Sequence, residues 1–236
     1  MNEHVILMGP QGSGKGTQSH RIRNELNLSS VATGELFRAA IKNQTDLGAQ
    51  IREIYDRGEL IPDELTIELV DERLDEIARE SALAGRNPGH LYDGFPRTAN
   101  QAKALDELLK RRGERITRVI AIDVPRQALI KRLSGRRVCS ICGRVYNVES
   151  DPPREPGRCD DDGGELIQRA DDTAEAVAKR LDLYEAETAP LLDRYADRGL
   201  LVRIDGDQPI EEVTNSIRAA IRDGAAVSVG ALESRR

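Results

Sequence analysis

The chain has 236 residues, a formal net charge of −6 and a hydrophobic content of 39%. This length supports one good hydrophobic core with small insertions. No apolar run approaches the ~20 residues of a membrane span, and the acidic balance with 3% aromatic residues argues against nucleic-acid binding, so we expect neither partner.

The N-terminus enters an apolar run almost at once, without a basic segment or a signal core, which predicts a cytoplasmic protein. Short apolar runs then alternate with longer amphipathic ones. The apolar runs predict strands at 4–8, 29–32, 90–93, 118–124 and 200–205. The amphipathic runs predict helices at 16–26, 34–42, 46–57, 63–80, 98–112, 125–133, 171–196 and 209–223. This alternation predicts an α/β fold, a parallel five-stranded sheet with helices on both faces.

A glycine-rich loop, GPQGSGKGT at residues 9–17, joins the first predicted strand to the first predicted helix. Strand, glycine loop and helix form the context of a phosphate-binding loop. Glycines let backbone N–H groups surround phosphate oxygens, and the helix N-terminus adds its partial positive charge. We expect a nucleoside triphosphate to contact the second half of this loop: Gly12, Ser13, Gly14, Lys15, Gly16 and Thr17.

Two stretches, 33–62 and 135–171, interrupt the alternation of strands and helices. The first is helical only, and the second carries glycine, proline and cysteine with short β-like pieces, so both are predicted insertions. Within the longest predicted helix an apolar stripe predicts core packing, and Pro190 predicts a kink. The tail at 224–236 has no clear period and is expected to be disordered.

The second insertion contains the three cysteines of the chain. Cys139 and Cys142 form one Cys-x-x-Cys pair, and Cys159 begins a second group whose fourth position is Asp162. Zinc accepts three thiolates and a carboxylate, and four protein ligands make a closed, structural site. The few apolar residues of this insertion cannot build a stable core alone. We therefore expect a structural zinc ion, with the two preceding aspartates as alternative fourth ligands.

Several motifs occur in a fixed order along the chain. They are GPQGSGKGTQ (9–18), TGELFR (33–38), GELIPDE (58–64), DGFPRT (93–98) with Gln101, GRRV (135–138), RADD (169–172) and DG (205–206). On these motifs the chain, from residue 4 to about 222, resembles the long-type adenylate kinases, which carry a zinc-bearing lid. Gln11 stands where the family usually has proline, whereas the order Gly16–Thr17 is the family's own form.

The resemblance implies transfer of the γ-phosphoryl group of MgATP to AMP, which gives two ADP. It implies ATP, AMP and ADP as partners, Mg²⁺ and structural Zn²⁺ as cofactors, and a monomer. It also implies three parts, which are a P-loop core (1–32, 63–134 and 172–223), an AMP-binding insertion (33–62) and a zinc-bearing lid (135–171). The two insertions would close over AMP and ATP and exclude water.

The resemblance also implies a role for individual residues. The charge on the transferring phosphoryl group would be stabilised by Lys15, Arg97, Arg132, Arg136, Arg169 and Arg180. ATP would also contact Arg132, Arg136, Val145, Tyr146 and Gln208. AMP would contact Thr33, Arg38, Glu59, Leu60, Ile61, Gly94, Phe95, Pro96, Arg97, Gln101, Arg169 and Arg180, with Gln101 at the adenine edge. Asp93, at the end of a strand, would orient Mg²⁺ through water.

Two alternative functions remain open at this point. A kinase for another nucleoside monophosphate, such as GMP, UMP or CMP, would share the fold and the phosphate chemistry, because few residues read the base. A non-catalytic ATP-binding zinc-ribbon module is the alternative from another class. The acidic balance and the complete arginine set oppose this module.

Overall fold

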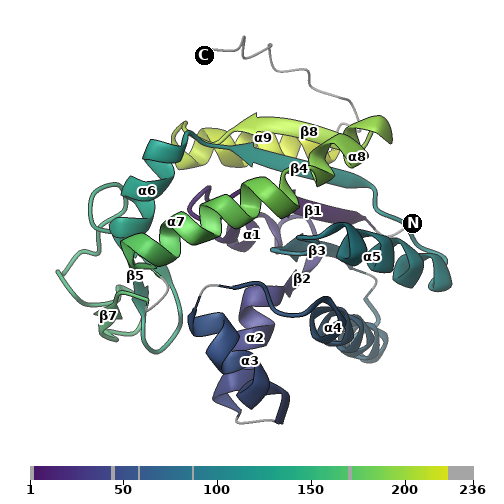
Figure 1. The fold of residues 1–236 in the computed structure, drawn as a ribbon, viewed down its shortest axis with the longest axis horizontal. Helices are drawn as coiled ribbons and strands as arrows, with labels where there is room; N and C mark the ends of the chain where they lie inside the picture. Colours follow the sequence, from purple (N-terminus) through teal and green to yellow (C-terminus); the bar gives the residue numbers. More distant parts are fainter. Residues whose placement is uncertain (1–2, 44–45, 58, 87, 170–171, 223–236) are drawn as a thin grey trace.

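The computed structural model describes residues 3–43, 46–57, 59–86, 88–169 and 172–222. Its main sheet has five parallel strands in the order β2-β3-β1-β4-β8 (Figure 1). These strands are β1 (His4–Met8), β2 (Leu28–Ala32), β3 (Gly89–Asp93), β4 (Arg118–Asp123) and β8 (Leu201–Asp205). The predicted parallel sheet is confirmed, and each predicted strand matches the observed bounds to within one residue at either end.

Alternate residues of the strands enter two different cores. On β1, Ile6 and Met8 face one layer of helices, formed by α4 (Asp63–Leu83), α5 (Ala99–Arg111) and α8 (Leu191–Asp197). Val5 and Leu7 face the other layer, formed by α1 (Lys15–Ile22) and α9 (Ile210–Arg222). A strand covered on both faces is apolar at nearly every position, which explains the run from Val5 to Met8.

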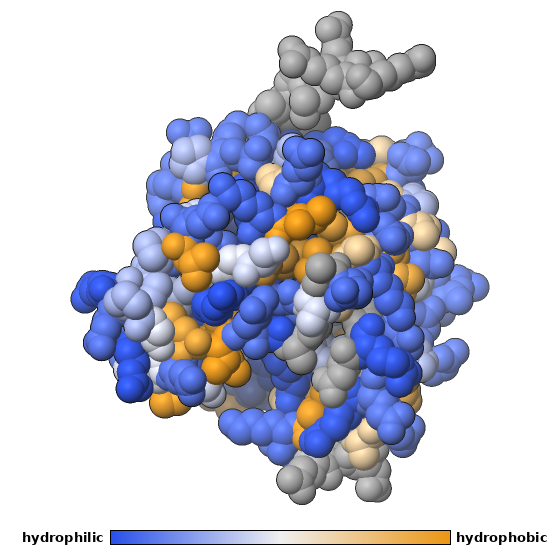
Figure 2. Space-filling view, turned by 60° about the vertical axis from the view of Figure 1, so that its left-hand side comes forward, coloured by the Kyte–Doolittle hydropathy of each residue, from blue (hydrophilic) through white to orange (hydrophobic). Residues whose placement is uncertain are grey.

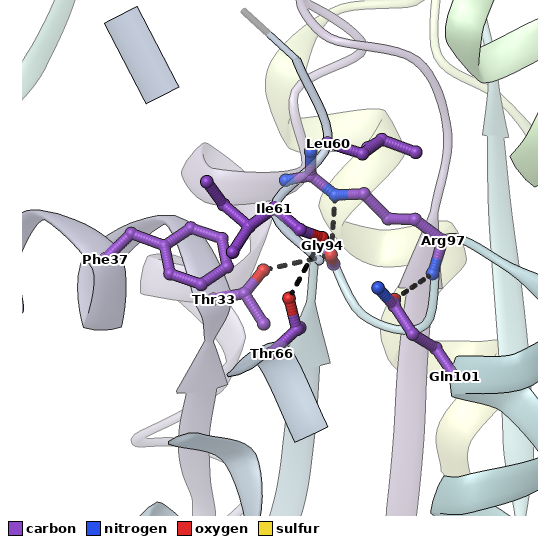
Figure 3. A pocket seen from close by; sticks show the side chains of 8 residues that line it. All are labelled: Thr33, Phe37, Leu60, Ile61, Thr66, Gly94, Arg97 and Gln101. Atoms are coloured by element: carbon purple, nitrogen blue, oxygen red, sulfur yellow. Dashed lines mark hydrogen bonds between the residues drawn. The ribbon is translucent and has the colours of Figure 1, made fainter. Parts of the chain in front are cut away.

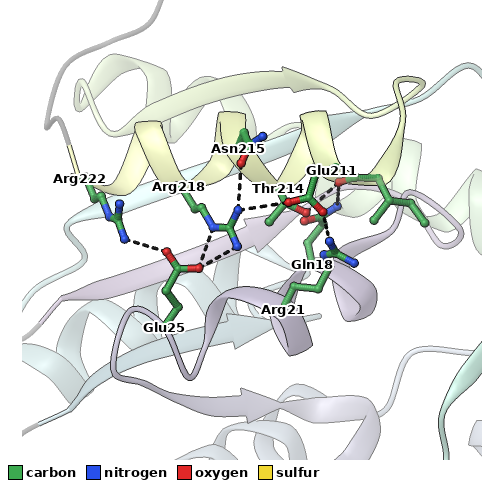
Figure 4. Close-up of polar contacts among 9 residues, drawn as sticks. Gln18, Arg21, Glu25, Glu211, Thr214, Asn215, Arg218 and Arg222 are labelled. Carbon is green, nitrogen blue, oxygen red and sulfur yellow. Dashed lines mark hydrogen bonds and ion pairs between the residues drawn. The ribbon is translucent and has the colours of Figure 1, made fainter.

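Polar contacts tie α9 to the segment that follows the glycine loop (Figure 4). Glu25 pairs with Arg218 and with Arg222 of α9, each at 2.7 Å. Gln18 of α1 is 3% exposed, and its Nε2 donates to the carbonyl of Ile210 at 3.1 Å. Exposed ion pairs contribute little, about 0.2–1 kcal/mol each, so burial of the apolar face of α9 against the sheet stabilises this helix more than they do.

Each insertion has a small core of its own. Helices α2 (Thr33–Lys42) and α3 (Asp46–Asp56) bring Phe37 and Ile51 together with Ile61. The second insertion forms a three-stranded antiparallel sheet in the order β6-β5-β7, made of β5 (Arg136–Cys139), β6 (Val145–Asn147) and β7 (Leu166–Ile167). In Figure 1 α2 and α3 lie below the main sheet, and the small sheet lies at the left, next to α6 (Arg126–Ser134) and α7 (Ala174–Leu183).

The prediction of one helix at 171–196 is wrong in its continuity. The structure has α7, a π-helical segment (Tyr184–Thr188) and then α8, which begins after Pro190. Proline has no backbone N–H and its ring clashes with the preceding turn, so a regular helix cannot pass through this position. Residue 171 and the predicted tail at 224–236 lie outside the described residues.

The apolar stripe predicted on this helix is buried, but its two halves enter different cores. Val177 and Leu181 pack against α6, whereas Leu191 and Tyr195 pack against the main sheet. The break at residue 190 therefore lets the two halves of this segment cover α6 and the main sheet separately.

The face of the molecule in Figure 2 is mostly hydrophilic and carries several apolar patches. Exposed apolar side chains of the second insertion include Ile141, Val145, Val148 and Ile167. No described helix combines the length and the apolar character that crossing a membrane requires.

Candidate active site

The loop between β1 and α1 takes a backbone path that requires glycine. Gly9, Gly12 and Gly14 have φ values of 146°, 84° and 101°, a range that side chains disfavour. A Cβ on Gly9 would lie 2.8 Å from the carbonyl oxygen of Ile122 on β4. Gly14 precedes α1 without a side-chain cap, so the loop ends at an open helix N-terminus, which favours an anion.

Lys15 turns its side chain back into this loop. Its Nζ donates to the carbonyls of Gly9 at 2.6 Å and Pro10 at 2.9 Å. These carbonyls hold the ammonium group over the loop, where the oxygens of a bound phosphate would replace them as acceptors.

Several predicted charged residues surround Lys15 closely enough to change its ionisation. Burial lowers the pKa of Lys15 from 10.5 to about 8, and the charge of Asp93 opposes this lowering. Three arginines lower the pKa of Lys15 further: Arg97, Arg180 and Arg136. The loop therefore lies in a concentration of positive charge, which suits a polyphosphate ligand.

Asp93 lies at the carboxyl end of β3, beside the first turn of α1. Its Oδ2 is 3.7 Å from the position that a Cβ on Gly16 would occupy. Burial raises the pKa of Asp93, against the opposing effects of Lys15 and Arg97. A half-buried carboxyl group at this strand end can hold a hydrated cation next to the loop.

A second pocket lies beside the carboxyl ends of the strands, between the first insertion and β3 (Figure 3). It is lined by Thr33, Phe37, Leu60, Ile61, Thr66, Gly94, Arg97 and Gln101. An apolar wall with a few convergent polar groups is typical of a site for a flat organic ligand. Six of the residues predicted to contact AMP lie together here.

Gly94 holds two of these side chains in place. Its carbonyl accepts from Thr33 Oγ1 at 3.0 Å and from Arg97 Nε at 2.7 Å. The φ of Gly94 is 78°, and a Cβ on it would lie 3.0 Å from Arg97 Nη2. Burial and the positive charge of Arg180 lower the pKa of Arg97. The two guanidinium groups are therefore close enough to repel each other.

Gln101 is 2% exposed, and its side chain is fixed at both ends. The backbone N–H of Arg97 donates to its Oε1 at 2.8 Å, and its Nε2 donates to Asp63 Oδ1 at 2.8 Å. Sequence reasoning missed Asp63. It lies within the GELIPDE motif, but only the folded chain brings it to Gln101.

The other residues predicted to contact AMP lie around this pocket. Phe95 and Pro96 are buried, and in the chain they lie between the pocket residues Gly94 and Arg97. Arg38 is exposed, and its Nη1 donates to Tyr55 Oη at 2.9 Å. Glu59 Oε1 pairs with Lys179 Nζ of α7 at 2.8 Å, a contact between the first insertion and α7 that sequence reasoning also missed.

Two predicted phosphate ligands lie at the base of the second insertion and are held by protein acceptors. Arg132 Nη2 donates to the Gly206 carbonyl at 2.9 Å and to Asp207 Oδ1 at 3.0 Å. Arg136 pairs through two nitrogens with Asp172, which is 3% exposed, and its Nε–Oδ2 distance is 2.8 Å. Asp172 belongs to the RADD motif, yet its role as the partner of Arg136 was not predicted.

The three cysteines and Asp162 converge as predicted. The four potential ligand atoms lie within 4.8 Å of one another. Cys142 Sγ lies 3.6 Å from Cys159 Sγ, and Cys139 Sγ lies 3.2 Å from Asp162 Oδ1. A tetrahedral zinc ion with Zn–S bonds of about 2.3 Å places its ligand atoms roughly 3.7 Å apart, so this donor set fits the metal.

Glycines and backbone N–H groups shape the cysteine cluster. A Cβ on Gly164 would lie 2.7 Å from Cys139 Sγ, so a larger residue would disrupt the cluster. The backbone N–H of Gly164 donates to Asp162 Oδ1 at 2.8 Å and, with the neighbouring Cys142 and Cys139 thiols, holds the pKa of Asp162 at about 2. Asp162 is therefore ionised, as a metal ligand must be.

The remaining predicted residues lie in less specific surroundings. Tyr146 is 1% exposed, and its Oη accepts from the Asp160 backbone N–H at 2.7 Å, so its ring belongs to the core of the second insertion. Val145 is exposed, as is Gln208, whose Nε2 donates to Asp205 Oδ2 at 3.4 Å. Arg169 is half-buried, and its carbonyl accepts from the Asp172 N–H.

The family model described as "Adenylate kinase" matches residues 7–200. The chain belongs to the adenylate kinase family. It is 51% identical over 218 residues to the adenylate kinase of Carboxydothermus hydrogenoformans, and the aligned residues cover 92% of this chain and 99% of that protein. It is 50% identical over 217 residues to the enzyme of Moorella thermoacetica, with 92% and 97% covered. It is 46% identical over 215 residues to the enzyme of Bacillus subtilis, and the aligned residues cover 91% of this chain and 96% of that protein.

Adenylate kinases are phosphotransferases that convert ATP and AMP to ADP, and they use Mg²⁺ with ATP. The resemblance, fold class, function and enzyme class predicted from the sequence are therefore confirmed. Neither a kinase for another nucleoside monophosphate nor a non-catalytic zinc-ribbon module is favoured. The roles of individual residues in adenylate kinase chemistry remain predictions.

Proposed function

We propose that the glycine loop binds ATP and that the pocket of Figure 3 binds AMP, so that the γ-phosphoryl group passes between them. The observation that carries this assignment is the electrostatic coupling of Lys15, in the loop, to Arg97, which lines the pocket. One concentration of positive charge therefore serves both sites, as transfer between two phosphate groups requires.

The chemistry itself needs no base. An oxygen of the AMP phosphate attacks the γ-phosphorus of ATP in line with the leaving oxygen of ADP, and the attacking oxygen is already ionised. The protein contributes position and charge. In this proposal Lys15 stabilises the β- and γ-phosphates, Arg38 and Arg97 hold the AMP phosphate, and Arg180 stabilises the group in transfer.

The arginines at the base of the lid would bind phosphate after they exchange their present protein acceptors for phosphate oxygens. Arg132 and Arg136 donate to protein oxygens in this structure. Arg169 is half-buried, and its carbonyl accepts from the backbone N–H of Asp172, the partner of Arg136. We assign all three to ATP or the transferring group when the lid closes. Val145, the backbone of Tyr146 and Gln208 would then contact the adenosine of ATP.

We assign each of the two metal ions to a group of side chains that suits it. Bound Mg²⁺ neutralises phosphate charge during transfer, and Asp93 would hold it through water beside the loop. Zinc would be structural, because Cys139, Cys142, Cys159 and Asp162 supply four ligands. The division into a core, an AMP-binding insertion (33–62) and a lid (135–171) is part of the same proposal, as are the monomeric state and the cytoplasmic location.

A coupled assay with ATP and one of AMP, GMP, UMP or CMP in turn, with ADP formation as the readout, tests the AMP assignment. We expect AMP to be used far better than the others. The variant Thr33→Val, which removes the hydroxyl beside Gly94, should raise the KM for AMP and leave the KM for ATP unchanged. Equal activity with GMP, or an equal rise of both KM values, would refute the assignment.

The zinc proposal has a separate test. Protein purified without chelator should contain about one equivalent of zinc, and replacing Cys139 and Cys142 by Ser should lower the metal content and the thermal stability of the lid. Ser140→Ala, an exposed change between the two cysteines, is the matched control and should alter neither. A metal content below half an equivalent in the unmodified protein would contradict the proposal.

A further inference from the structure

The side-chain amide of Gln101 is held between one group that only donates and one that only accepts. The backbone N–H of Arg97 lies 2.8 Å from Oε1, and the carboxylate of Asp63 lies 2.8 Å from Nε2. A backbone N–H cannot accept a hydrogen bond, and an ionised carboxylate cannot donate one. The orientation of the amide, which geometry alone often leaves ambiguous, is therefore determined by its partners.

Asp63 is itself fixed by two helices. It is the first residue of α4, where the helix dipole favours a negative charge. Its Oδ2 accepts from Thr98 Oγ1 at 2.8 Å, and Thr98 caps α5 by accepting from the backbone N–H of Gln101 at 3.1 Å. The carboxylate, the hydroxyl and the amide thus form one connected network at the N-termini of α4 and α5.

One donor and one acceptor of Gln101 remain for a ligand. An amide has two N–H bonds and two carbonyl lone pairs, and Asp63 and Arg97 each use one of them. Gln101 lines the pocket of Figure 3, so the remaining pair can serve a base bound there. Adenine offers a donor, its 6-amino group, beside an acceptor nitrogen. A 6-oxopurine offers the reverse order on its Watson–Crick edge, because O6 accepts and N1–H donates.

We propose that Asp63 is a positioning residue for base specificity: it holds the Gln101 amide in the orientation that matches a 6-aminopurine and opposes a 6-oxopurine. An amide free to rotate by half a turn would match either base, whereas an amide fixed by Asp63 matches one. The inference rests on the proposed function, in which Gln101 reads the base of the nucleoside monophosphate.

The test compares kcat/KM for AMP with kcat/KM for inosine 5′-monophosphate, with ATP as the donor. In Asp63→Ala the acceptor is lost, and in Asp63→Asn the new amide can either donate or accept. In both variants we expect the preference for AMP to fall about tenfold, the size of one hydrogen bond. The change should lie mainly in a higher KM for AMP and a better use of inosine 5′-monophosphate. The Arg97 N–H should retain part of the preference.

Two further variants separate the possible outcomes. Glu64→Gln removes a charge from the same first turn of α4, where Glu64 is exposed, and should leave the preference unchanged. Gln101→Ala should abolish it. If Gln101→Ala abolishes the preference and neither Asp63 variant reduces it, the positioning role is wrong and the proposed function stands. If Gln101→Ala leaves the KM for AMP and the preference unchanged, the proposed AMP site itself is wrong.

A purely structural role of Asp63 would give another result. Both Asp63 variants would then lose activity with AMP and with inosine 5′-monophosphate by the same factor, and their ratio would stay constant. That outcome would overturn the proposal, even if thermal unfolding showed a loss of stability.

Discussion

Lys15 shows how the surroundings of one side chain set its ionisation. A lysine ordinarily stays protonated well above neutral pH, but burial and three nearby arginines lower its pKa to about 8. Only the protonated form attracts phosphate. The nearby positive charges that make the site suitable for ATP thus lower the pKa of Lys15. A bound anion would raise it again.

The free protein should therefore lose its attraction for ATP as the pH rises through about 8. Because the pKa is lowered, the charged form is present below this pH and is lost above it, and kcat/KM reports groups of the free enzyme. We expect kcat/KM for MgATP to fall about tenfold per pH unit above this point. Measurements from pH 6.5 to 9.5 at saturating AMP would show it.

Arginine at the same position provides the control for this prediction, because its guanidinium stays charged throughout this range. Whatever activity Lys15→Arg retains should lack the decline above pH 8. If kcat/KM of the unmodified protein shows no decline up to pH 9.5, the surroundings do not lower the pKa of Lys15 from its ordinary value of 10.5.

The candidate site shows which residues can be predicted from a sequence. The glycine loop, Asp93 and the cysteines were predictable, because the local pattern carries their chemistry. The partners of Gln101 and Arg136 were not, because Asp63 and Asp172 lie 38 and 36 residues away from them along the chain. Which carboxylate meets which donor depends on how helices and strands pack, and no spacing in the sequence encodes it.

The strands were easier to predict than the helices that cover them. A central parallel strand is covered on both faces and is therefore apolar along its middle, so β1 and β4 show as continuous apolar runs with polar ends. The segment at 171–196 has the right helical period throughout, yet a proline and two different cores divide it. Periodicity reports the buried face of a helix but cannot show that its two halves pack on different partners.

The amino ends of β1 and β3 carry a buried pair of histidines, away from the glycine loop. His4 pairs in register with His90, and the two rings stack with their centroids 4.6 Å apart. His4 Nδ1 lies 3.1 Å from Tyr92 Oη. Burial lowers the pKa of His4 to about 3 and that of His90 to about 4, each from 6.5. Both are therefore neutral in the folded protein at pH 7.

This pair should make the protein less stable in mild acid. Below pH 6.5 these two histidines bind protons in the unfolded chain. In the folded protein they stay neutral until the pH falls to about 4. The free energy of unfolding should thus fall as the pH drops, by at most about 1.4 kcal/mol per pH unit for each histidine. Urea unfolding between pH 7 and 5 measures this slope.

Two variants identify the source of this slope. His90→Gln removes one titrating ring and should reduce the slope, whereas His20→Gln, an exposed change on α1, should leave it unaltered. An equal slope in His90→Gln and the unmodified protein would assign the acid sensitivity to other groups.

At the scale of the whole molecule, α7 lies between the two insertions (Figure 1). Its Lys179 pairs with Glu59 of the first insertion at 2.8 Å, and the two residues are 120 positions apart in the sequence. Arg57 also pairs with Glu59 at 3.1 Å. Hydrogen bonds from Arg57 and Lys179 lower the pKa of Glu59 to about 2, so the pair stays charged at physiological pH.

If the first insertion moves to admit AMP, as the resemblance implies, this ion pair favours the position next to α7 that the insertion takes in this structure. Both side chains are partly exposed, at 46% and 37%, so solvent screens the pair and its contribution is small. Lys179→Met should therefore raise the KM for AMP about two- to fivefold and speed the release of ADP. Steady-state kinetics with a rapid-quench measurement of product release would test this.

The matched control removes a lysine that forms an ion pair elsewhere. Lys103 lies on α5 and reaches Glu107 at 4.0 Å, so Lys103→Met changes the net charge equally without touching the first insertion. In a double-mutant cycle the effects of Lys179→Met and Glu59→Gln should be less than additive, because both changes remove the Lys179–Glu59 contact, although Glu59→Gln also removes the contact with Arg57. High salt should weaken AMP binding in the unmodified protein more than in Lys179→Met, since the exposed pair is screened. Fully additive effects of the two changes would mean that the pair does not hold the insertion next to α7.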